Sequence, residues 1–140
     1  MTAFRVLVTG SRTWTDAALV SAELDTQRAI RPTLVVVHGA APGGADEMAA
    51  AWCTRQWVSG GVVEERHPAP WAEVGKAAGM VRNAEMVRAG ADLCLAFIAD
   101  CASPRCGRPR PHGTHGASDC AHRAEAAGIP TRRFGAQVMT

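Results

Sequence analysis

The sequence has no long hydrophobic run, since every apolar stretch falls well short of the roughly 20 residues that a membrane-spanning helix needs. Its amino terminus lacks the basic segment followed by an apolar stretch that is typical of an export signal. Five cysteines make an odd set, which favours reduced thiols or metal ligands over a disulfide framework. We therefore expect a cytoplasmic protein with no membrane contact.

The chain also has little excess of positive over negative charge. Its formal net charge of +2 is too small to indicate a polyanionic partner. Arginines nevertheless crowd the last third of the chain, at positions 105, 108, 110, 123, 132 and 133. They alternate with prolines rather than aromatic residues, so the stacking surfaces expected of a single-stranded nucleic-acid module are missing. The cluster fits a solvated surface or a small anionic ligand, and we do not expect nucleic acid as a partner.

The composition is that of a globular protein, with 47% hydrophobic and 20% charged residues. A length of 140 residues matches one domain with one core, so we expect a single domain over residues 1–140. Short β-branched runs alternate with helical patterns, as in a parallel sheet covered by helices. The predicted strands are 4–9, 34–38, 62–66, 93–98 and 131–134. The fold class is therefore α/β, a Rossmann-like domain with about five parallel strands and helices on both faces.

Four helices are predicted between these strands. The first covers 16–30 with Thr15 or Asp16 as its cap, and the second has an apolar stripe over 45–53. The third places Met80, Ala84 and Val87 on one face and stops at Gly90, and the fourth covers about 117–127 and stops at Gly128. Residues 101–116 form an insertion rich in Cys, His, Arg and Pro. A loop of that length is usually functional or disordered.

Ligands of an open α/β sheet bind beyond the carboxyl ends of the strands, so the strand-to-helix turns are the candidate site. In the first turn Gly10 allows a sharp bend, Ser11 offers a hydroxyl, and Arg12 can pair with a phosphate or carboxylate. A simple turn with a surface arginine explains the same residues.

The second turn is more specific, because it is rich in glycine where a buried strand meets the clearest helix. Its free N–H groups and the positive end of the helix suit a phosphate, held by Gly39, Gly43 and Gly44. Asp46 could bind a ribose hydroxyl or serve as a structural carboxylate at the helix start. His38 could contact the ligand or simply pack.

A third segment, 71–83, brings two cations and an amide toward the same site. We predict that Lys76, Arg82 and Asn83 bind ligand, although a cationic helix start is the alternative. Trp71 and Trp14 could stack on a base or line the pocket, or pack in the core.

Taken together these motifs resemble one family. They are Val-Thr-Gly-Ser-Arg at 8–12, His-Gly-x-x-x-Gly-Gly-Ala-Asp at 38–46, Trp…Gly-Lys…Gly-x-x-Arg-Asn-x-x-Met at 71–86, and Gly-Ile-Pro at 128–130. The chain resembles the SLOG superfamily, and within it the YspA-like, cpYpsA-related branch common in actinobacteria and their phages. The resemblance covers roughly 4–134. It implies a Rossmann-like fold that senses or processes nucleotides or nucleotide-derived signals.

Some SLOG relatives, the LOG-type phosphoribohydrolases, cleave the N-glycosidic bond of nucleoside monophosphates with an arginine and a glutamate. The resemblance assigns the arginine to Arg82. The glutamate position becomes Cys120 or Ala117, depending on register. Asp119 is a substitute acid, but it points about 100° away on a helix. In the same segment, Gly116 and Ser118 are further candidate ligand-binding residues.

The insertion supplies two thiols and two imidazoles, the donor set of a tetrahedral zinc site. We predict a structural zinc held by Cys101, Cys106, His112 and His115, with Cys120 and His122 as rival ligands. Such a site would present Arg105, Arg108 and Arg110 over the pocket. A reduced, flexible, basic loop is the alternative.

The preferred hypothesis from sequence is a module that binds a nucleotide or nucleotide derivative. The first alternative is a nucleoside-monophosphate hydrolase in which Arg82 orients the substrate and Asp119 or Asp46 activates water. The second is single-stranded nucleic-acid binding. By analogy with LOG-type relatives, a homodimer is expected.

Overall fold

The computed structural model describes residues 3–135, apart from the side chain of Lys76. Five parallel strands form one sheet in the order β3-β2-β1-β4-β5. The strands are β1 (Phe4–Gly10), β2 (Leu34–His38), β3 (Val62–Arg66), β4 (Leu93–Phe97) and β5 (Thr131–Phe134). The Rossmann-like α/β fold and all five predicted strands are thus confirmed, with ends that differ by at most one residue.

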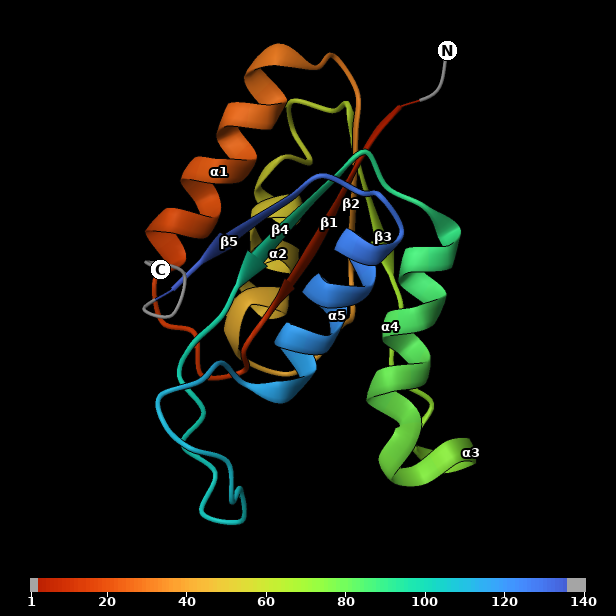
Figure 1. Ribbon diagram of the computed structural model, residues 1–140. Helices are drawn as coiled ribbons and strands as arrows, with labels where there is room; N and C mark the ends of the chain where they lie inside the picture. The colour runs from red at the N-terminus through yellow and green to blue at the C-terminus, as the bar shows by residue number, and fades with distance from the viewer. Residues whose placement is uncertain (1–2, 136–140) are drawn as a thin grey trace.

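Helices cover both faces of the sheet, α1 and α2 on one and α4 and α5 on the other (Figure 1). Their bounds are α1 (Ala17–Ile30), α2 (Gly44–Arg55), α3 (Trp71–Val74), α4 (Ala78–Ala89) and α5 (His115–Ala126), with a 3₁₀ turn η1 (Gly75–Ala77) before α4. Within residues 3–135, no helix combines the length and the apolar character needed to cross a membrane.

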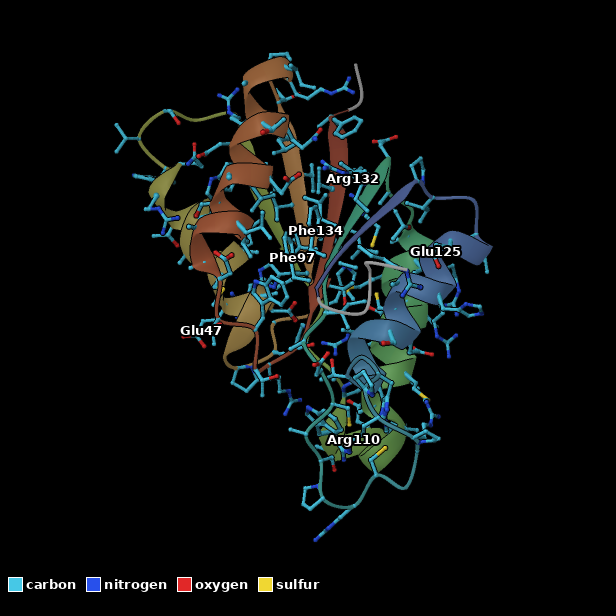
Figure 2. The ribbon with its side chains drawn as sticks, turned by 60° about the vertical axis from the view of Figure 1, so that its left-hand side comes forward. Glu47, Phe97, Arg110, Glu125, Arg132 and Phe134 are labelled. Carbon is cyan, nitrogen blue, oxygen red and sulfur yellow. The ribbon has the colours of Figure 1, made fainter. Side chains whose placement is uncertain are left out.

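The alternation of side chains along β1 divides the core into two clusters. Val6 and Val8 pack on one face with Trp52 of α2, and all three are at most 1% exposed. Leu7 packs on the opposite face with Met86 of α4. Phe97 and Phe134 extend the first cluster across β4 and β5, with ring centroids 4.9 Å apart, and Figure 2 shows them side by side. Both faces of the central strands are therefore buried, as their apolar runs predicted.

The central position of β1 determines where a ligand can enter. β1 pairs with β2 on one side and with β4 on the other. From β1 the chain adds β2 and β3 in one direction across the sheet, and it then adds β4 and β5 in the opposite direction. The connections after β1 and β4 then leave toward opposite faces and open a crevice between them. Gly10 at the end of β1 stands opposite Phe97 at the end of β4.

The apolar face expected on α4 is only in part the buried one. Val87 packs against the core, but Met80 is 54% exposed, and the fully buried residues of this helix are Ala78, Asn83 and Met86. The hydropathy pattern missed Asn83 because a polar residue does not mark a buried face, and its amide finds partners on α5. Helix α3 was not predicted, because four residues show no periodicity. Helix α5 begins at His115, two residues before its predicted start.

Candidate functional site

A cavity of about 340 Å³ lies beyond the carboxyl end of β1, at the point where the strand order reverses. The structure brings seven predicted site residues together in its wall: Gly10, Ser11, Arg12, Asp46, Arg82, Asn83 and Gly116. Four predicted residues are not among its lining residues: Gly39, Gly43, Gly44 and Ser118. The side chain of Lys76 lies outside the part of the chain that the structure describes.

Ser11 is bound by protein groups on two sides. Its Oγ accepts a hydrogen bond from the Ala99 N–H at 2.8 Å, and its hydroxyl also bonds the hydroxyl of Thr114. The residue is 3% exposed. Ser11 therefore braces the end of β1 against both ends of the loop that joins β4 to α5. Sequence reasoning missed Thr114, although a threonine just before a helix is a capping signal.

The glycine-rich turn before α2 is lined by the protein's own carboxylates. The Ala41 N–H donates to Asp46 at 3.2 Å, and the Gly43 N–H donates to Glu47 at 2.5 Å. Figure 2 labels Glu47 at this end of α2. Gly44 has φ +64°, and a Cβ there would overlap the Ser11 carbonyl oxygen, so close packing against the first turn requires glycine. Two amides predicted to cradle a phosphate are thus engaged within the protein.

Asp46 lines the cavity but is only 6% exposed. Burial raises the pKa of Asp46 above its ordinary value, while the hydrogen bond from the Ala41 N–H and the nearby charge of Arg82 act in the opposite direction. His38 is fully buried and is not among the lining residues. Its Nδ1 accepts from the Ala40 N–H at 3.0 Å, and its Nε2 lies 2.5 Å from a Glu64 carboxylate oxygen. His38 therefore ties β2 to β3, which fits the packing interpretation of its sequence position.

Arg82 reaches from α4 across the cavity to the second turn. Its Nη1 donates to the Gly39 carbonyl oxygen at 2.5 Å, and its Nε donates to Asn83 Oδ1 at 2.9 Å. A Cβ on Gly39 would overlap the Arg82 guanidinium, so glycine is what lets the cation approach this turn. Gly39 thus acts on the site through Arg82.

Asn83 connects α4 to α5. Its Nδ2 donates at 3.1 Å both to the Gly116 carbonyl oxygen and to Asp119 Oδ2. The same Asp119 oxygen accepts from Arg123 Nε at 2.8 Å, and Asp119 is not among the lining residues of the cavity. The side-chain amide of Asn83, 2% exposed, therefore holds the start of α5 in place.

The mouth of the cavity pairs a cation with an aromatic ring. Arg12 is exposed, and its guanidinium carbon lies 5.8 Å from the ring centroid of Trp71. Trp71 is half exposed and lines the cavity, as one of its predicted roles requires. Trp14 instead packs on Phe97, with centroids 5.7 Å apart.

The amino terminus of α5 closes the opposite wall. Thr114, Gly116 and Ala117 all line the cavity. Thr114 is the N-cap residue but makes no side-chain cap bond, since its hydroxyl is used by Ser11. The first turn of a helix carries a partial positive charge, so this wall favours an anion.

Beside the cavity, the loop over 101–114 and the first residue of α5 together supply the four predicted metal-binding residues. The donor atoms of Cys101, Cys106, His112 and His115 all lie within 4.8 Å of one another. The two imidazole Nε2 atoms are 3.3 Å apart, and three S···N distances are 3.3, 3.4 and 3.8 Å. A tetrahedron with zinc–nitrogen bonds near 2.0–2.1 Å and zinc–sulfur bonds near 2.3 Å has edges of about 3.3 and 3.6 Å. The group has the size needed to hold a metal ion.

Surrounding contacts orient these donors. His112 Nδ1 lies 2.8 Å from the Pro109 carbonyl oxygen, so Nδ1–H donates there and Nε2 faces the other ligands. The rival ligands Cys120 and His122 do not belong to this group, and Cys120 of α5 is buried in the hydrophobic core. None of the three loop arginines lines the cavity, and Arg110 instead donates to the carbonyl oxygens of Cys101 and Ser103 within the loop.

The remaining cysteines have no such environment. Cys53 and Cys94 are buried, and burial raises the pKa of each thiol to about 12. Burial likewise raises the pKa of Cys120 to about 11. At neutral pH these three thiols are protonated and packed as small apolar groups.

A parallel sheet in this order, with a cavity at its switch point, defines the chain as a Rossmann-like α/β protein. More specifically, the chain belongs to the YspA, cpYpsA-related SLOG family, whose model matches residues 4–73. A relative, the Gene 61 protein of Mycobacterium phage D29, is 44% identical over 134 residues, covering 94% of this chain and 96% of its own length. No solved structure matches the chain. Membership of this family implies a nucleotide-related binding domain.

Proposed function

We propose that the cavity binds a nucleotide or a nucleotide-derived ligand as a sensor or binding module. The observation that carries the proposal is the convergence of Arg12, Arg82 and the amino terminus of α5 on one cavity of about 340 Å³. A guanidinium matches the geometry of a phosphate, and a helix start attracts the same charge. The volume falls in the range of small-molecule sites.

The phosphate position that we propose differs from the one expected from sequence. Because the amides of Ala41 and Gly43 already donate to carboxylates, the turn before α2 is a poor anion site. The wall formed by Gly116 and Ala117 at the start of α5 is better suited. Asp46 then faces the ribose hydroxyls, and Trp71 at the mouth offers a surface on which a base can stack.

A second candidate function is hydrolysis of an N-glycosidic bond, and Asp46 is the observation that favours it. This carboxyl lines the cavity with a pKa raised by burial, a common property of catalytic acids. Asp119 does not line the cavity and is paired with Arg123. In this reading Arg82 orients the phosphate and Asp46 moves the proton.

We also propose that the Cys/His group binds zinc as a structural ion. Two thiolates and two imidazoles complete a tetrahedral shell, which leaves no open position for a substrate. The hydrogen bond from His112 to Pro109 supplies the outer contact that such ligands usually make.

The test of ligand binding is a thermal-shift screen of nucleoside mono-, di- and triphosphates, cyclic nucleotides and ADP-ribose. A ligand at about 100 times its Kd stabilises the native state by about 2.7 kcal/mol, so a true ligand raises the melting temperature by several degrees. Arg82→Ala should lose the shift, whereas Arg88→Ala, on the same helix but not at the cavity, should keep it. If no compound shifts the unmodified chain, the proposal is wrong.

Release of free base from the same compounds tests the hydrolase reading. Turnover that Asp46→Asn abolishes and Asp119→Asn leaves intact would establish it. Binding without release of base would favour the proposed sensor or binding module over the hydrolase.

A further inference from the structure

The metal group and the cavity share a segment of chain. His115 provides one of the four donor atoms and is the first residue of α5. The residues on either side of it, Thr114 and Gly116, line the cavity, as does Ala117. Displacement of His115 therefore displaces the wall that we propose receives the phosphate.

The base of the metal-binding loop is fastened to the same wall. The Cys101 N–H donates to the His112 carbonyl oxygen at 2.7 Å, and the Thr114 N–H donates to the Ala99 carbonyl oxygen at 3.0 Å. Ser11, in the cavity, then bonds Ala99 and Thr114, the residues at the start and end of the loop. The conformation of the loop base is thus coupled to the turn after β1 through the hydrogen bonds of Ser11.

Little apolar burial holds the loop. Between 101 and 114, only Cys101 is buried. Fixing each backbone residue costs about 1–2 kcal/mol of conformational entropy, which apolar burial normally offsets. Hydrogen bonds from Arg110 to the carbonyl oxygens of Cys101 and Ser103 hold part of the loop, and a metal bound by the four donor atoms would add a second means of closing it.

We propose that metal binding at Cys101, Cys106, His112 and His115 orders the α5 wall of the cavity, so that zinc and the cavity ligand bind cooperatively. The second half of this statement rests on the proposed nucleotide function. Zinc-loaded protein presents the wall in its binding geometry, and zinc-free protein must order it on binding. By linkage, the ligand raises the affinity for zinc by the same factor by which zinc raises the affinity for ligand.

Hydrogen exchange tests the first half without any nucleotide. Amide exchange is measured by mass spectrometry on the zinc-loaded chain, on the chain stripped with a chelator, and on Cys106→Ser. We expect exchange at 114–117 and at 10–12 to become at least about tenfold faster on stripping. Amides of α1 should not change.

Two variants control this experiment. In Cys106→Ser the amides of 114–117 should exchange rapidly before any treatment, and the chelator should not change their rate. Arg108→Ala, in the same loop, should behave as the unmodified chain. Equal exchange at 114–117 with and without zinc would overturn the proposal. A chain that binds no zinc would overturn it too.

The second half is tested with adenosine monophosphate and inorganic phosphate as probes. Zinc affinity is measured by competition with a chromogenic chelator, with and without each probe. We expect at least one probe to raise zinc affinity about tenfold. If every probe that binds leaves the zinc affinity unchanged, the coupling is wrong. If neither probe binds any form while exchange still responds to zinc, the ordering of the wall stands and the nucleotide proposal fails for these ligands.

Discussion

Two glycines, Gly39 and Gly44, perform different tasks although both belong to the second turn. Gly44 packs against the backbone of the first turn with a positive φ, so it is part of the fold. Gly39 has ordinary backbone angles, and the group that a Cβ would meet is the Arg82 guanidinium. A methyl group at Gly39 therefore acts on the cation more than on the backbone.

We predict that Gly39→Ala displaces Arg82 and weakens nucleotide binding with little loss of stability. The displaced Arg82 would lose its charge-assisted hydrogen bond to the ligand phosphate, which is worth about 1.5–3 kcal/mol, so the Kd for the nucleotide should be at least about tenfold higher. Isothermal titration with the compound that gives the largest thermal shift measures this. Gly107→Ala is the matched control, since a Cβ there meets nothing within 4 Å. Unchanged affinity in Gly39→Ala would contradict the role given to Arg82.

Among the elements, β3 at the edge of the sheet is held by a charged network. Arg5 of β1 reaches across β2 and pairs with both carboxylate oxygens of Glu65, at 2.9 and 2.8 Å. His67 Nε2 lies 2.7 Å from Glu65, and its Nδ1 lies 3.0 Å from Glu85 of α4. Burial lowers the pKa of His67, but the bonds to the two carboxylates outweigh it and leave the pKa raised. The network joins β1, β3 and α4.

The stability that Glu65 contributes should depend on pH. The hydrogen bonds from Arg5 and His67 lower the pKa of Glu65 from 4.5 to about 2. A carboxyl with a depressed folded-state pKa contributes stability above its unfolded value and loses it as pH falls through the folded value. Glu65→Gln should therefore cost about 1 kcal/mol at neutral pH, a size suited to a partly exposed pair.

Urea denaturation across the acid range tests this prediction. The difference between Glu65→Gln and the unmodified chain should shrink between about pH 4.5 and pH 2. Glu73→Gln, an exposed residue of α3, should change stability by less than about 0.5 kcal/mol. A difference that stays constant down to pH 2 would refute the assignment of the network.

At the scale of the whole molecule, local patterns were enough to predict the sheet. The runs at 34–37 and 93–97 are apolar throughout, and the first is rich in β-branched valine, whatever surrounds them. Alternation of such runs with helices predicts parallel order. The metal group could be proposed because four thiol and imidazole donors fall in one short segment, but the choice against Cys120 required knowing that its thiol is buried in the core. Two features of the site could not be predicted: the hydrogen bonds from the turn amides to Asp46 and Glu47, and the burial of the Asn83 amide. Both depend on contacts in three dimensions, which the periodicity of the sequence does not report.

Removal of the zinc that we propose should lower the melting temperature of the whole chain. An ion that binds only the folded state adds stability, and each 1 kcal/mol corresponds to roughly 2–8 °C for chains of this size range. We expect chelator to lower the melting temperature of the unmodified chain by about 5 °C or more, measured by calorimetry. Cys106→Ser should melt at the lower temperature with or without chelator. An equal response of both proteins would show that the chelator acts elsewhere.

The narrow base of the metal-binding loop has a consequence for engineering. Asp100 and Gly113 form an antiparallel bridge, so the chain leaves and re-enters the body of the protein at adjacent points. Figure 1 shows the loop extending beyond the carboxyl ends of the strands. A two-residue turn can join such points in a hairpin. If the pocket depends on zinc as we propose, replacing 102–111 by a turn of that kind would form the pocket permanently and would separate ligand recognition from the supply of metal.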